Sequence, residues 1–75
     1  MILTVEKEKC DDGEIAICFN HEGLELLISK LMKLRGGPDH LHLMTPAWAG
    51  SELTEEGRGG PRYEVCNSLR LVHLP

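Results

Sequence analysis

Apolar and polar side chains alternate along the first stretch of the chain, from Ile2 to Lys9. Leu3 and Val5 would face one side of a strand, and the polar residues Thr4 and Glu6 the other. A period of two is typical of a half-buried β-strand. The pattern therefore predicts that the chain begins with such a strand.

The same alternation returns from Glu14 to Phe19 and predicts a second strand. Its apolar side would carry Ile15, Ile17 and Phe19, and its other side Ala16 and Cys18. Asp12 and Gly13 separate the two stretches, and Asp-Gly is a strong hairpin-turn signal. We therefore expect an N-terminal β-hairpin.

A helical spacing of apolar residues follows the hairpin. The residues of this stripe are Leu24, Leu27, Ile28, Leu31 and Leu34. Asn20 is suited to cap the start of the helix by accepting backbone N–H groups. Gly36 and Gly37 favour its end, and Pro38 prevents its continuation. The stripe predicts a helix that packs on the core.

A third strand is predicted from His40 to Met44. Leu41 and Leu43 would share one side of it, while His40, His42 and Met44 would share the other. The Gly-rich segment from residue 47 to 61 indicates a long connection, with a short helical turn expected at residues 51–56. A final strand is predicted over residues 62–74, with a break near Asn67 and Ser68.

These elements predict one α+β domain over residues 1–75, a two-layer β-β-α-β-β arrangement with the helix across one face of a small, mostly antiparallel sheet. The face beneath the helix would carry Leu3, Val5, Ile15, Ile17, Phe19, Leu41, Leu43 and Val65. The opposite face would stay uncovered and would carry Thr4, Glu6, Cys18, His40, His42, Met44 and Cys66. So short a chain builds only a small core, which leaves room for self-association.

Charge and cysteine usage narrow the class of protein. Eight Lys and Arg against twelve Asp and Glu give a net charge of −4. That balance argues against nucleic acid and anionic membranes as partners, because both are bound through basic groups. The three cysteines form no CxxC pair, and the N-terminus lacks the pattern of a signal peptide. We therefore expect free thiols and a cytoplasmic location.

Candidate chemistry is sparse. His40 and His42 would project from one side of a strand about 7 Å apart, so a zinc site shared with Cys18 and Cys66 is an alternative to two ordinary surface histidines, the favoured interpretation. No nucleophile has a defined base and a group to orient it, so the protein is predicted not to be an enzyme, with no catalytic residues and no cofactor. The glycines of residues 57–60 precede a strand rather than a helix, which disfavours a phosphate-binding loop.

Trp48, the only tryptophan, is predicted to lie in a loop between Pro46 and Gly50. A chain of this size needs its large aromatic for core cover, so packing is favoured over exposure. Tryptophan is also enriched in interface hot spots, which keeps a binding role open.

Two neighbouring segments, GLELLISKLMKL and DHLHLMTPAWAGSEL, resemble the bacterial immunity protein 32 family of polymorphic toxin systems. The likeness covers roughly residues 20 to 54. Its features are Gly23 and Leu24, the run His40-Leu41-His42-Leu43, Thr45-Pro46, Trp48, Gly50 and Glu52-Leu53. The family pattern often has a glycine after the tryptophan, where this sequence has Ala49.

The resemblance implies a small α+β protein that binds a cognate toxin and has no catalytic residues. The residues expected to contact this partner are His40, His42, Met44, Trp48, Glu52, Glu55 and Glu56. If the toxin is a nuclease, the glutamates and Asp39 would imitate the phosphates that it binds. A metal-binding domain and a module that forms a homodimer through its open sheet face are the alternatives.

Overall fold

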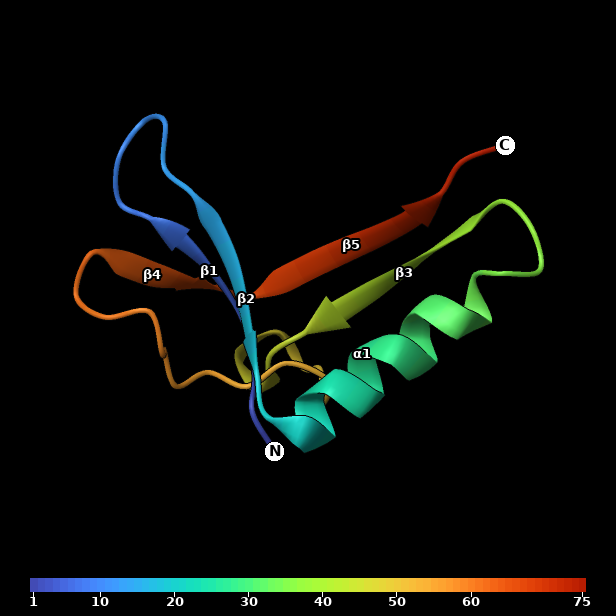
Figure 1. The fold of residues 1–75 in the computed structure, drawn as a ribbon, viewed down its shortest axis with the longest axis horizontal. Helices are drawn as coiled ribbons and strands as arrows, with labels where there is room; N and C mark the ends of the chain where they lie inside the picture. Colours follow the sequence, from blue (N-terminus) through green and yellow to red (C-terminus); the bar gives the residue numbers. More distant parts are fainter.

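Five strands, one α-helix and one 3-10 turn follow one another along the chain in the computed structural model, which describes residues 1–75 (Figure 1). The elements are β1 (Leu3–Glu8), β2 (Ile15–Phe19), α1 (His21–Lys33), β3 (Asp39–Met44), η1 (Pro46–Trp48), β4 (Tyr63–Cys66) and β5 (Ser68–His73). The predicted α+β class and the β-β-α-β-β order are confirmed. No helix has both the length and the apolar character needed to cross a membrane.

The strands divide between two antiparallel sheets, ordered β2-β1-β4 and β3-β5. β1 and β2 form the predicted hairpin, and Asn67 makes the predicted break between β4 and β5. The Asn67 carbonyl accepts the Thr45 N–H at 3.0 Å, and its side chain accepts the Thr45 hydroxyl at 2.8 Å. Asn67 therefore links the two sheets, which diverge from this point (Figure 1).

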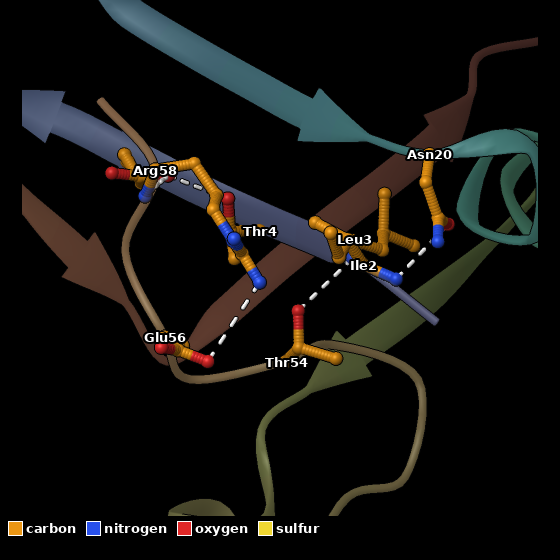
Figure 2. A network of polar contacts seen from close by, with 8 residues as sticks. Ile2, Leu3, Thr4, Asn20, Thr54, Glu56 and Arg58 are labelled. Atoms are coloured by element: carbon orange, nitrogen blue, oxygen red, sulfur yellow. Dashed lines mark hydrogen bonds and ion pairs between the residues drawn. The ribbon is translucent and has the colours of Figure 1, made fainter.

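The start of α1 is fixed to the start of β1. The Asn20 side-chain oxygen accepts the Gly23 N–H at 3.0 Å, so the predicted cap is confirmed. The same oxygen accepts the Ile2 N–H, also at 3.0 Å (Figure 2). A Cβ atom on Gly23 would lie 1.8 Å from the Ile2 carbonyl oxygen. Only glycine fits at this contact, which brings the helix directly against the strand.

The buried core is small. Leu3, Val5, Leu43 and Leu53 form it, and Leu26, Leu27, Cys66, Leu69 and Leu71 pack against it. The predicted helical stripe is only partly correct, because Ile28 and Leu31 are exposed. The contact at Gly23 turns the helix so that Gly23, Leu27 and Leu34 face inward. The other side of the stripe then faces away from the core.

The apolar side of β2 was expected in the core, and that expectation is wrong. Ile15 is 60% exposed, and Ile17 and Phe19 are 40% and 48% exposed. β2 is an outer strand of its sheet, and the other sheet diverges from it (Figure 1). These three side chains are therefore only partly covered, although they lie on the same face as the buried Leu3 and Val5.

The opposite face of the sheet was expected to be open, and this expectation is also wrong. Thr4 and Glu6 are 0% and 1% exposed. The connection between η1 and β4 passes over them, as Thr54 and Arg58 show (Figure 2).

The two sides of β4 also face the reverse of the predicted directions. Val65 lies opposite Glu6 on the covered polar face, whereas Cys66 lies opposite Val5 on the core face. The predicted alternation is present, but which side faces the core depends on the register of β4 with β1.

Candidate functional site

The segment after β3 forms a tight turn that is held by its own backbone. The Thr45 carbonyl accepts the N–H groups of Trp48 and Gly50, each at 2.9 Å. Ala49 has a left-handed conformation with φ of 63°. A Cβ on Gly50 would lie 2.3 Å from the Met44 carbonyl oxygen, so a side chain does not fit there. This turn occupies residues 46–48, and the helical turn expected at residues 51–56 does not form.

Trp48 projects from this turn and is 57% exposed, so the favoured expectation that it packs into the core is wrong. Leu53 takes the core position instead, with 1% of its surface exposed and its N–H bonded to the Met44 carbonyl at 3.1 Å. A leucine supplied by the same loop leaves the larger indole available at the surface.

His40, His42 and Met44 lie on one side of β3, as predicted. The register places Val72 of β5 opposite His40, and Arg70 opposite His42. We call these five residues the histidine face. The rings of His40 and His42 meet edge to face, with centroids 5.3 Å apart. Met44 is half-buried and the other four are exposed, so the face offers two imidazoles and a guanidinium beside apolar atoms.

The three glutamates predicted to contact a partner all lie on the loop after Trp48, and each has a local contact. Glu55 accepts the Ala47 N–H at 2.6 Å, and Glu56 pairs with Arg58 at 3.7 Å (Figure 2). The Ser51 N–H, 2.7 Å from Glu52, lowers the pKa of that carboxyl despite the opposing effect of burial. These contacts hold the carboxylates on one loop, where Glu55 and Glu56 remain exposed.

Glu6, which was expected on an uncovered face, is a buried charge. Its carboxylate accepts the Thr4 hydroxyl at 2.6 Å and the N–H groups of Arg58 and Gly59, each at 2.9 Å. Burial alone would raise the pKa of Glu6, but these bonds and one from Cys18 lower it from 4.5 to about 2. The network fastens residues 58 and 59 of the long Gly-rich connection to the sheet.

The zinc alternative finds no support in the arrangement of its residues. Cys18 pairs with Thr4 and Cys66 with Val5, so the two thiols lie on opposite faces of one sheet. His40 and His42 belong to the other sheet. No group of three or more His, Cys, Asp or Glu side chains is arranged to hold a metal ion.

The apolar surfaces are the features that sequence reasoning missed. Besides β2, the exposed apolar side chains include Ile28, Leu31 and Met32 on α1. A hollow of about 350 Å³ lies between the end of α1 and β5, lined by Leu31, Leu34, Arg35, Leu71, Val72 and His73. Alternation identifies the apolar side of a strand, but it does not tell whether another segment covers that side.

Comparison with known proteins gives one match. The family model described as immunity protein 32 matches residues 14–59, which include β2, α1, β3 and the turn that carries Trp48. No curated protein and no solved structure matches the chain. The family match includes every residue of the resemblance described above.

Proposed function

The chain belongs to the immunity protein 32 family, and we propose that it binds and neutralises a cognate protein toxin without catalysing a reaction. The family match over residues 14–59 is the observation that carries this proposal. In this proposal the protein acts in the cytoplasm, where it protects the cell that makes the toxin.

The residues of the family resemblance fall into two groups. Gly23, Thr45, Gly50 and Leu53 build the fold through close backbone approach or burial. His40, His42 and Trp48 are exposed and have no comparable part in holding the elements together. Residues without a structural task are the natural candidates for binding, because the fold does not require their identity.

We propose that the histidine face and Trp48 contact the toxin. An exposed indole offers a large apolar surface that loses little side-chain entropy on binding, and tryptophan is prominent among interface hot spots. Trp48 follows Met44, the last residue of β3, by four residues. In this proposal it therefore extends the surface that begins with the histidine face.

We propose that Glu52, Glu55 and Glu56 extend this surface toward basic groups of the toxin. The net charge of −4 would also favour encounter with a basic partner through long-range attraction. If the toxin is a nuclease, these carboxylates and Asp39 would compete for the basic side chains that bind phosphate.

The test is co-expression with the polypeptide encoded next to this gene, followed by a binding measurement on the purified pair. We expect restored growth and a nanomolar dissociation constant. Trp48→Ala should raise that constant at least about 30-fold, as expected for a hot spot. Met32→Ala is the matched control, because Met32 is 52% exposed on α1 and should change binding little.

Two results would contradict the proposal. Absence of binding to every neighbouring toxin candidate would remove the function. Equal effects of Trp48→Ala and Met32→Ala would leave the function but place the toxin-binding surface elsewhere.

A further inference from the structure

The outer edge of β2 has no strand beside it. β2 is the first strand in the order β2-β1-β4. The Glu8 N–H bonds to the Glu14 carbonyl, and the Asn20 N–H to the Ile2 carbonyl. Even-numbered residues of this segment therefore direct their backbone groups toward β1, and odd-numbered residues direct theirs outward. The outward groups belong to Ile15, Ile17 and Phe19, and no other hydrogen bond involves them.

The same edge lacks the features that usually prevent strand pairing. Outer strands of natural sheets commonly carry charged side chains, proline or a bulge. β2 reads Ile-Ala-Ile-Cys-Phe and has none of these. Its three large side chains are at least 40% exposed. An unpaired, uncharged and apolar edge is a template for another strand.

The chain also exposes more surface than its mass predicts. Its accessible area is 5096 Å², whereas a compact monomer of 8.4 kDa exposes about 4,600 Å². Its radius of gyration is 12.8 Å, against about 11 Å for a compact chain of this length. The excess is therefore about 500 Å² per chain. If each of two copies buried that area, the interface would reach the roughly 1,000 Å² in total that a specific interface needs.

We propose that two copies of this chain pair through β2, antiparallel about a two-fold axis at Ile17. In that register Ile17 meets the partner's Ile17, and Ile15 meets the partner's Phe19. Each such pair exchanges two backbone hydrogen bonds, about six in all, which uses every outward group of the strand. The two β2-β1-β4 sheets become one sheet with a continuous apolar face.

The acidic turn before β2 favours this antiparallel pairing. Asp11, Asp12 and Glu14 precede the strand, whereas the neutral Asn20 follows it, before His21 and Glu22. Antiparallel pairing separates the two acidic turns and places Glu14 beside the partner's Asn20. Parallel pairing would place the two acidic ends together, at an electrostatic cost.

This pairing is independent of toxin binding. The histidine face belongs to the β3-β5 sheet, whereas β2 belongs to the other sheet. A closed two-fold dimer would therefore present two copies of the histidine face and Trp48. Failure of dimerisation would leave the proposed function intact.

The first measurement is light scattering across a concentration series, combined with amide hydrogen exchange. We expect a dimer in which the Ile15, Ile17 and Phe19 amides are protected and lose that protection on dilution. The Ala16 and Cys18 amides, which face β1, should be protected at every concentration. A monomer at millimolar concentration overturns the proposal, and so does a dimer in which the three outward amides exchange freely.

The second measurement uses two matched variants. Ile17→Lys places two like charges at the two-fold axis and should raise the dimer dissociation constant at least about 100-fold. Met32→Lys adds the same charge at an exposed position on α1 and should leave the constant within about twofold. A helical circular dichroism signal and cooperative unfolding of Ile17→Lys would confirm that the variant is folded. An unchanged dimer in folded Ile17→Lys, or dissociation by both variants, would overturn the pairing through β2.

Discussion

The two faces of the β2-β1-β4 sheet differ in how far their side chains are exposed, and the polar face is the more completely covered one. On one face, the loop before β4 fully covers the polar side chains of Thr4 and Glu6. On the other face, the large apolar side chains of β2 are half exposed. Leu3 and Val5 on this second face are nevertheless buried, so polarity alone did not decide which side chains became buried. The path of the loop before β4 decided the burial of the polar face, because that loop could satisfy a buried carboxylate.

The covered face is tolerated because its polar groups are satisfied. No buried side-chain nitrogen or oxygen lacks a hydrogen-bond partner. A buried carboxylate without partners would cost several kcal/mol. Glu6 instead receives bonds from a hydroxyl and two backbone N–H groups. The other face, which carries Ile15, Ile17 and Phe19, has no such constraint, so its exposed part remains available for association.

The largest expected loss of stability comes from a change on the covered face, at Glu6. Glu6→Gln replaces an acceptor oxygen with an NH₂ group that opposes one of the backbone donors. We expect the free energy of unfolding to fall by about 4 kcal/mol, since bonds to a buried charged group contribute about 1.5–3 kcal/mol each. Urea denaturation measures this.

Glu64→Gln is the control for that change. Glu64 forms an exposed pair with Lys7 at 3.3 Å, and its loss should cost about 0.5 kcal/mol or less. Similar effects of the two variants would show that the Glu6 network does not stabilise the fold.

Acid should weaken the covered face next. The pKa of Glu6 is about 2 in the folded protein, against 4.5 for a glutamate without these contacts. Because the folded pKa is the lower one, the stabilisation is complete above about pH 4.5 and is lost as the pH falls toward 2. The loss should reach about 3 kcal/mol at most. Denaturation between pH 7 and 2 should show a steeper decline for the wild type than for Glu6→Gln, and parallel curves would contradict this.

A smaller effect of the opposite sign is expected at Ala49. Its left-handed backbone conformation is unfavourable for every residue with a Cβ and costs alanine about 1 kcal/mol. Ala49→Gly should therefore raise the free energy of unfolding by about 1 kcal/mol or slightly less. Gly60→Ala, at a glycine with a φ of 91° and open space around it, tests the reverse change. Destabilisation by Ala49→Gly would mean that the methyl group makes contacts that outweigh the strain.

The smallest effect on the free energy of unfolding is expected at the exposed apolar side chains of β2. Ile15→Thr, at a 60% exposed position, should cost about 0.5 kcal/mol when the chain is monomeric. Val5→Thr, on the same face but buried, should cost about 2 kcal/mol because the hydroxyl finds no partner. Thermal unfolding of dilute protein measures both losses of stability. Equal losses would show that the exposed side of β2 is covered in solution.

Local features of the fold could be predicted from the sequence. Asn20 caps α1 because its side chain and the donors it meets are close in sequence, and alternation identifies the first three strands for the same reason. The break at Asn67 also follows from a local interruption of the pattern. These features depend on neighbouring residues alone.

Features that depend on distant segments could not be predicted. Glu6 is buried by residues more than 50 positions later, and no local pattern contains that information. The sides of β4 depend on its register with β1, which placed Val65 and Cys66 the other way round. The same holds for the site. The shared side of His40, His42 and Met44 followed from alternation, whereas the exposure of Trp48 depended on Leu53 taking its place in the core.

The position of β1 in the middle of its sheet has a consequence for the order of folding. Its pairing with β2 joins residues near in sequence, so the hairpin can form early. Its pairing with β4 and the bonds to Glu6 must wait until residues 58–66 have been made. During synthesis, we expect β1 to stay half-paired and Glu6 to stay hydrated until residues 58–66 are present. β1 is translated before the other four strands but is therefore among the last to be completed.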